Sequence, residues 1–125
     1  MPVSIEKAIY NKLITLDVLP ALYWRQAPAG SREPYVVMVL VDDPRTKRML
    51  CYYGGEARIQ FGVFDTDAGR GDETAMILVD NVRALRGLQD GLRIDAFVTN
   101  IVTLPNADEM FQRTVDVIVR YTEEA

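Results

Sequence analysis

Apolar residues recur with helical spacing in two segments of the chain. In the first segment they predict a helix over residues 4–16, with Ser4 as its N-cap. The apolar face consists of Ile5, Ala8, Ile9, Leu13 and Leu16. The polar face, which we expect to meet solvent, consists of Glu6, Lys7, Asn11 and Lys12.

The second helical segment is predicted over residues 72–86. Its apolar stripe consists of Ala75, Leu78, Val79, Val82 and Leu85. Gly87 follows at the position where a residue in the left-handed conformation commonly ends a helix.

Strand-like patterns occupy much of the remaining chain. The segments that we predict as strands are 35–41, 57–63, 92–103 and 111–122, with a shorter extended piece at 21–26. Residues 35–41 are apolar on both faces, so we expect that both faces of this strand are covered, in part by another chain. The last strand alternates most strictly, and Arg113 is the charged residue on its apolar side.

The order of these segments predicts one α+β domain over residues 1–125. We expect a mainly antiparallel sheet of about four to five strands with two helices packed on it. Hairpins are expected at 35–64 and 92–122. A chain of 125 residues buries roughly two-thirds of its unfolded surface, which suffices for one core. No apolar run approaches the ~20 residues of a membrane helix, so no membrane contact is expected.

Composition removes several kinds of chemistry. The chain has no histidine and a single cysteine, Cys51. Histidine-based triads, imidazole metal sites, thiolate zinc sites and an internal disulfide are therefore excluded. The formal net charge is −4, whereas a surface that grips nucleic acid needs clustered basic residues. We expect a protein that folds in a reducing cytoplasm.

Residues 65–74, DTDAGRGDET, concentrate four carboxylates and two glycines directly before the second helical pattern. A calcium loop counted from Asp65 lacks the required geometry, because Gly69 and Arg70 stand at positions 5 and 6 and Met76 at position 12. A dinucleotide-binding fingerprint lacks its third glycine. Neither motif is present.

We interpret this acidic segment as a turn that starts a helix. Gly69 and Gly71 are expected to reverse the chain, while Asp72 and Glu73 cap the helix and complement its dipole. The alternative is a bound ion or phosphate. Its ligands would come from Asp65, Asp67, Asp72 and Glu73.

The segment 42–56 is predicted as an extended hairpin arm. It combines cations with rigid aromatic rings, which are residue types that interfaces favour, in a connection longer than the fold needs. A solvated loop is the alternative. The arm residues that we predict to contact a neighbouring subunit or partner are Arg45, Lys47, Arg48, Tyr52 and Tyr53.

An ordered set of pieces resembles a known family. The pieces are SIEKAIYNKLITL (4–16), LYWRQAP (22–28), EPYVVMVLVDD (33–43), the continuous stretch from ARIQFGVFD to RALRGL (57–88) and FQRTVDVIVRYTEE (111–124). Together they cover nearly the whole chain, which resembles the tail terminator or tail completion proteins of long-tailed bacteriophages. The longer 42–56 arm departs from the family's pattern.

The resemblance implies a structural protein that is not an enzyme and has no cofactor or metal. Its subunits would form a ring, usually a hexamer, on the head-proximal end of the tail tube. The ring would end tube polymerisation and provide the surface that joins the head connector, while genomic DNA passes through the lumen without specific binding. The protein would assemble in the host cytoplasm and stay at the neck end of the virion tail. Carboxylates expected in the lumen or in intersubunit ion pairs are Asp65, Asp67, Asp72 and Glu73.

Two alternative functions remain open at this point. One is a connector or stopper protein on the head side of the same neck, which would differ in its partner and in ring symmetry. The other is a small domain that binds a metal or ligand through the carboxylates of residues 65–73. A nucleic-acid regulator is disfavoured by the acidic charge balance.

Overall fold

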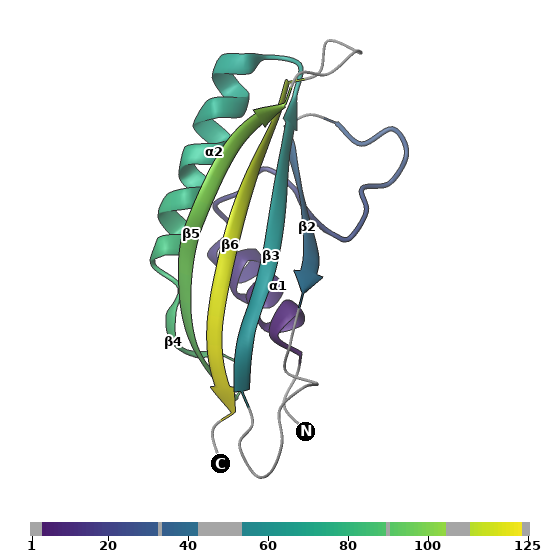
Figure 1. Cartoon of the computed structure of the whole chain (residues 1–125). Coiled ribbons are helices and arrows are strands. Elements are labelled where there is room, and N and C mark those ends of the chain that lie inside the picture. The colour runs from purple at the N-terminus through teal and green to yellow at the C-terminus, as the bar shows by residue number, and fades with distance from the viewer. Residues whose placement is uncertain (1–3, 33, 43–53, 90, 105–110, 124–125) are drawn as a thin grey trace.

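The computed structural model describes residues 4–32, 34–42, 54–89, 91–104 and 111–123. These residues form two helices and a six-stranded sheet. The elements are α1 (Ile5–Leu16), β1 (Leu22–Trp24), β2 (Tyr35–Asp42), β3 (Gly54–Asp65), α2 (Ala68–Arg83), β4 (Arg86–Gln89), β5 (Leu92–Leu104) and β6 (Phe111–Glu123). Figure 1 shows both helices against one face of the curved sheet. The α+β class expected from the sequence is confirmed.

The strand order in the sheet is β1-β2-β3-β6-β5-β4. Strands β1 and β2 pair in parallel, and the other neighbours pair antiparallel. The prediction of four to five strands was wrong, because the sheet has six strands and is mixed. The strand that we missed, β4, reads RGLQ and carries no apolar alternation. Its extended form comes from pairing with residues Leu92–Asp95 of β5, a tertiary contact that local pattern does not reveal.

Both predicted hairpin pairings are present in the sheet. Strand β2 pairs with β3 and β5 with β6, in registers such as Val36 opposite Val63 and Ile94 opposite Tyr121. The predicted arm at 42–56 begins and ends inside this sheet, because Asp42 belongs to β2 and Gly54 starts β3. Residues 43–53 lie outside the described part of the chain.

The hydrophobic core lies between the helices and the covered face of the sheet. The alternation predicted for the last strand is confirmed, since its apolar positions on one side are buried. Phe61 of β3 is the largest fully buried side chain. Core side chains from β3 and β6 are Ala57, Ile59, Phe61, Val63, Val115, Val117, Val119 and Tyr121.

Strand β2 differs from its prediction. Val36 and Met38 are buried, as expected for a core strand. On the other face, however, Val39 and Val41 are 38% and 51% exposed, so the described residues cover only one face of β2 fully. Whether another chain covers the second face remains a prediction.

The first helix has the predicted N-cap. The backbone N–H of Lys7 donates to Ser4 Oγ at 3.1 Å, and the helix ends at Asp17, whose φ is 52°. Glu6 is a correction, because it was placed on the polar face and is only 3% exposed. The chain folds back through β1 and brings the Arg25 guanidinium to the Glu6 carboxylate at 2.9 Å, which compensates the buried charge.

The second helix begins four residues earlier than predicted, at Ala68, and ends at Arg83 instead of residue 86. The N-cap is Asp67, so the prediction that Asp72 and Glu73 cap the helix was wrong. A capping carboxylate must precede the first turn, and Asp72 and Glu73 lie inside the helix because it begins at Ala68.

The glycines around α2 also differ from their predicted roles. Gly69 and Gly71 lie inside the helix. A Cβ added at Gly71 would lie 2.5 Å from Cδ1 of Phe111, so this glycine lets α2 approach β6 closely. Gly87 does not end the helix but lies in β4 with a φ of 99°.

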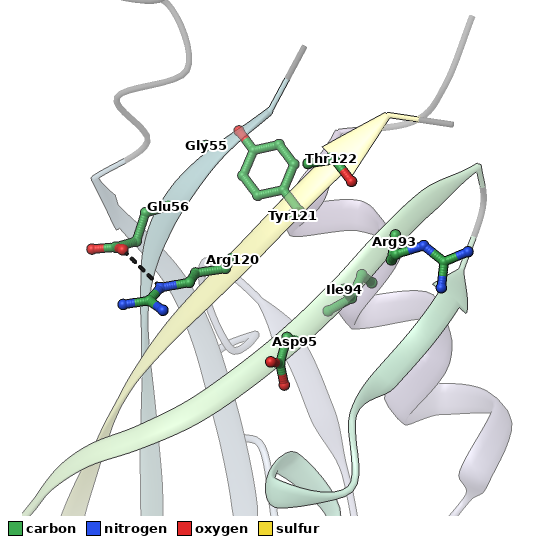
Figure 2. Close-up of a pocket in the computed structure, with 8 residues that line it drawn as sticks. All are labelled: Gly55, Glu56, Arg93, Ile94, Asp95, Arg120, Tyr121 and Thr122. Atoms are coloured by element: carbon green, nitrogen blue, oxygen red, sulfur yellow. Dashed lines mark hydrogen bonds and ion pairs between the residues drawn. The ribbon is translucent and has the colours of Figure 1, made fainter. Parts of the chain in front are cut away.

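The uncovered face of the sheet carries a row of alternating charges at one end. Arg120 of β6 donates to Glu56 of β3 at 3.1 Å, and Arg86 of β4 lies 3.4 Å from Asp95 of β5. Figure 2 shows the Glu56–Arg120 pair on adjacent strands, with Asp95 on the next strand. Such exposed cross-strand pairs contribute about 0.2–1 kcal/mol each.

Candidate functional site

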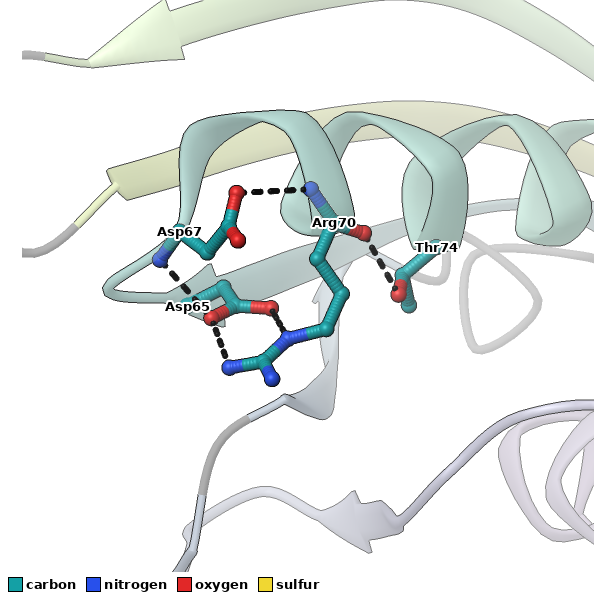
Figure 3. A network of polar contacts seen from close by, with 4 residues as sticks. All are labelled: Asp65, Asp67, Arg70 and Thr74. Atoms are coloured by element: carbon teal, nitrogen blue, oxygen red, sulfur yellow. Dashed lines mark hydrogen bonds and ion pairs between the residues drawn. The ribbon is translucent and has the colours of Figure 1, made fainter.

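The carboxylate of Asp65 forms the centre of the β3–α2 turn. Its side chain has no exposed surface. Arg70 donates to it through Nε and Nη2, both at 2.7 Å, and the backbone N–H of Asp67 donates at 2.9 Å. Figure 3 shows this bidentate pair between the end of the strand and the first turn of the helix. Charge-assisted bidentate bonds of this kind are among the strongest polar contacts in proteins.

These contacts fix the charge of Asp65. The hydrogen bonds from Arg70 hold the pKa of the Asp65 carboxyl below its usual value, and they outweigh burial, which raises that pKa. The backbone N–H groups of Asp67 and Thr66 lower the pKa further. Asp65 is therefore ionised at neutral pH inside the fold.

The neighbouring polar groups complete the start of α2. The backbone N–H of Arg70 donates to Asp67 Oδ1 at 3.1 Å, and Thr74 Oγ1 donates to the carbonyl of Arg70 at 3.0 Å (Figure 3). Asp67 thus satisfies one of the free N–H groups of the first helical turn. A strand-to-helix turn is present as predicted, but it is confined to residues 65–67, because residues 68–74 already belong to α2.

The two remaining acidic residues lie further along α2. Asp72 pairs with Arg113 of β6, the charged residue that the strand pattern placed on the apolar side. Arg113 is 26% exposed, so its stem crosses the core edge and its guanidinium reaches the helix. Glu73 is exposed. Asp65 and Asp67 thus bond to Arg70 and Asp72 bonds to Arg113, so the fold does not gather the four carboxylates around one site.

No group of three or more metal-ligating side chains occurs among the residues that the structure describes. Because Asp65 is buried, only Asp67, Asp72 and Glu73 lie where a neighbouring subunit or a lumen could meet them. Their placement in an assembly remains a prediction.

The five predicted arm residues, Arg45, Lys47, Arg48, Tyr52 and Tyr53, lie outside the described residues. Their contacts with a neighbouring subunit or partner stay a prediction.

Sequence reasoning missed a second buried carboxylate near the N-terminus. Glu6 accepts from Arg25 Nη2 at 2.9 Å, and the Arg25 guanidinium also lies 5.3 Å from the centre of the Trp24 ring. Burial is the largest single effect on the pKa of Glu6 and raises it. The hydrogen bonds and charge of Arg25, together with hydrogen bonds from Trp24 and the backbone of Leu40, outweigh burial, so the net pKa is lowered. Arg25 has a φ of 74°, which few non-glycine residues adopt. Trp24 stacks on Tyr10 of α1, with ring centres 5.5 Å apart.

The uncovered face of the sheet carries a groove and an aromatic cluster that the sequence did not reveal. An open groove of about 380 Å³ lies beside the charge row, between the ends of β3, β6 and β5 (Figure 2). Farther along the same face, Tyr35 stacks on Phe64 with ring centres 5.0 Å apart, and Tyr23 lies edge-on to Tyr35. Facing residues on adjacent strands depend on register, and a single sequence does not give the register.

No protein-family model and no curated protein matches the sequence. Among solved structures, the chain is similar to a chain of the "Virion of native gene transfer agent (GTA) particle". The two superpose with a TM-score of 0.67 over 95% of each chain, at 17% sequence identity. They share a fold. No described helix is long and apolar enough to cross a membrane.

Proposed function

We propose that this protein is a structural component of a phage-like virion. The observation that carries the proposal is the match of nearly the whole fold, 95% of each chain, to a chain of a gene transfer agent virion. Folds host many functions, so the match is joined to the independent sequence resemblance to phage tail terminator proteins. Both point to the same class of particle.

Within the virion, the protein forms a ring, of six subunits by the resemblance, on the head-proximal end of the tail tube. The ring ends tube polymerisation and presents the surface to which the head connector or stopper attaches. The net charge of −4 suits a lumen through which DNA passes without binding tightly. The exposed Val39 and Val41 on the uncovered face of β2 supply apolar surface suited to contact between subunits.

The geometry of the acidic turn favours a structural role over ligand binding. Asp65 is bound by Arg70, Asp67 caps α2, and Asp72 pairs with Arg113. A ligand at these carboxylates would have to break contacts that hold α2 on the sheet. Calorimetry with Ca²⁺ and Mg²⁺ is expected to show no binding heat, and a saturable signal would favour the ligand-binding alternative.

The decisive experiment mixes the purified protein with polymerising tail tube protein. We expect electron micrographs to show rings on one end of each tube and shorter tubes as the protein concentration rises. Bare tube ends combined with binding to the isolated head connector would identify a head-side neck protein instead.

The arm offers a matched pair of variants for this assay. Replacing Arg45 and Arg48 by Glu is expected to reduce capping, if the arm contacts the tube or a neighbouring subunit. Arg32→Glu changes an exposed arginine outside the arm and is expected to leave capping unchanged. Equal capping by the two variant proteins would mean that the arm does not contact the tube or a neighbouring subunit.

A further inference from the structure

One edge of the sheet is open. Strand β5 pairs with β6 from Leu92 to Leu104, but it pairs with β4 only from Leu92 to Asp95. The next backbone contact on that edge is the N–H of Ala96, which donates to the carbonyl of Leu85 at 3.2 Å. Beyond it, no strand among the described residues lies on this side of β5. Figure 1 shows β4 beside only the lower part of β5.

The open part of β5 lacks most features that protect sheet edges. Residues 96–104 read AFVTNIVTL and contain neither a charged residue nor a proline. Proteins commonly guard a free edge with lysines, prolines or very short strands, and here only the bulge between Val98 and Asn100 interrupts the edge. Thr99, Asn100 and Thr103 are exposed. Roughly four N–H and four C=O groups of this segment point outward, as in any edge strand.

The opposite edge of the sheet is also incomplete. Strand β1 pairs with β2 only at Val36, Val37 and Met38. The backbone N–H of Arg25 adds one bond to the carbonyl of Met38 at 2.7 Å. No described strand covers β2 from Val39 to Asp42 on this side. The backbone N–H of Leu40, however, donates a hydrogen bond to the Glu6 carboxylate, so α1 already occupies part of this stretch. The described residues therefore leave two sheet edges without a neighbouring strand, one on each side of the sheet.

The strand directions make these two edges compatible. From β2 to β3, β6 and β5 each step is antiparallel, so β5 runs opposite to β2 and to the parallel strand β1. In a ring, neighbouring subunits keep the same direction along the ring axis when the strands follow it. Strand β5 of one copy would then meet the β1–β2 edge of the next copy antiparallel, which continues the alternation of the sheet.

We propose that the open edge of β5, residues 96–104, pairs with the β1–β2 edge of a second copy of this chain. This contact is head-to-tail, because two different surfaces meet, and repeated contacts of this type close into a ring. Main-chain hydrogen bonds supply the interaction, as in strand addition elsewhere. The inference rests on the proposed ring, and it specifies which surfaces the ring uses.

Cysteine cross-linking tests the pairing directly. In a Cys51→Ser background, Asn100→Cys marks the β5 edge and Val39→Cys marks the β2 edge. A short bismaleimide linker is expected to give a ladder of multimers only when both cysteines are in the same chain. Dimers from Asn100→Cys alone would show that two β5 edges pair with each other and would overturn the head-to-tail contact.

Charged edge variants test the same contact without a linker. Leu104→Lys places a lysine on the open edge. Asn100→Lys places one at a position opposite Asp116 of β6, so the new charge has a partner inside the subunit. Both are expected to abolish the multimer seen by native mass spectrometry, while the circular dichroism spectrum is expected to show that each variant subunit stays folded. The matched control is Ile14→Lys on α1, since Ile14 is 47% and Leu104 40% exposed. The control is expected to keep the multimer.

Two results would overturn the inference, and they separate it from the proposed function. Folded edge variants that still form multimers and cap tubes would leave the function standing and remove β5 from the contact. Wild-type protein that stays monomeric, both alone and with tail tubes, would contradict both the β5 contact and the proposed function. If the cross-linked ladder forms but no tube is capped, the β5 contact stands and the tail-terminator role fails.

Discussion

The turn at Asp65 and the edge at residues 96–104 of β5 treat polar groups in opposite ways. At Asp65 a buried carboxylate receives three hydrogen bonds from its own chain. Along β5 the described chain leaves a row of backbone groups unpaired on one side. A buried charge that is satisfied within the subunit is costly to leave without its partner, whereas an unpaired edge is a surface for another strand.

The carboxylates serve contacts within the subunit, whereas the edge offers contacts to a neighbour. The carboxylates that look most like a ligand site in the sequence, Asp65, Asp67 and Asp72, are bound by groups of the same subunit. The plain, uncharged segment that follows β4 is the one left available. Substitutions at the turn are therefore expected to lower the free energy of unfolding strongly. Substitutions on the β5 edge are expected to affect assembly.

Removing the partner of Asp65 is expected to have the largest effect. Arg70→Met leaves the carboxylate buried without its guanidinium and should lower the free energy of unfolding by about 3 kcal/mol. Arg83→Met, in the last turn of the same helix, is the control and should cost less than about 1 kcal/mol. Urea unfolding followed by circular dichroism measures both. Equal losses in the two variants would contradict a special role for the Asp65–Arg70 pair.

The same pair predicts a pH dependence. The pKa of Asp65 is lowered in the folded state, chiefly by the hydrogen bonds from Arg70, so the unfolded chain binds a proton at a higher pH than the folded chain does. The stability from this group is complete above the ordinary carboxyl pKa and is lost as the pH falls from roughly 5 towards 3. Glu6, whose pKa is also lowered, acts in the same direction.

Asp65→Asn separates the contribution of Asp65 from that of Glu6. The variant is expected to lose less stability than the wild type over the same acid range, because position 65 no longer titrates. Unfolding curves at several pH values measure the slopes. Parallel slopes for the two proteins would mean that Asp65 does not carry the pH dependence.

The contact between α2 and β6 gives the next effect. Gly71→Ala should destabilise the fold by about 1–3 kcal/mol, because the new Cβ would overlap the Phe111 ring. Gly69→Ala is a matched control in the same helix, where the new Cβ would lie 3.4 Å from Oδ1 of Asp67, an ordinary contact distance. The control should be neutral or stabilise by up to about 1 kcal/mol. Thermal unfolding distinguishes the two, and a stabilised Gly71→Ala would refute the close approach.

Loss of the helix cap is expected to be smaller. Asp67→Ala removes the side-chain acceptor for the Arg70 N–H and should cost about 1 kcal/mol, whereas Asp67→Ser keeps an acceptor and most of the stability. Both are measured by chemical unfolding. If the serine variant loses as much as the alanine variant, capping is not the function of Asp67.

The smallest effect on subunit stability is expected at the open edge. Leu104→Lys should change the free energy of unfolding by less than about 0.5 kcal/mol, because the side chain is exposed. Amide exchange in residues 97–104 should be fast in the monomer at outward-facing N–H groups and slow after assembly. Slow exchange in an isolated monomer would mean that the edge is already covered.

Local pattern was sufficient for the parts of the fold that bury a regular stripe. The alternation of β6 identified its core face, since burial of one face follows directly from the period of the element. The helical stripe of α1 did the same except at Leu16, which was predicted on the apolar face and is 37% exposed at the end of the helix. The turn chemistry of residues 65–74 was also read correctly as a class, although the capping residue proved to be Asp67.

Contacts between distant elements decided the rest. The Glu6–Arg25, Asp65–Arg70 and Asp72–Arg113 pairs, the strand β4 and the open edge of β5 depend on which segments meet and in what register. The sequence does not show whether solvent or a guanidinium compensates the charge of a carboxylate. It also does not distinguish an edge strand from an inner strand, because both can have the same pattern of apolar residues. The amino-acid order therefore specifies which faces are apolar, whereas the packed sheet specifies which polar groups are satisfied and which are left for a neighbour.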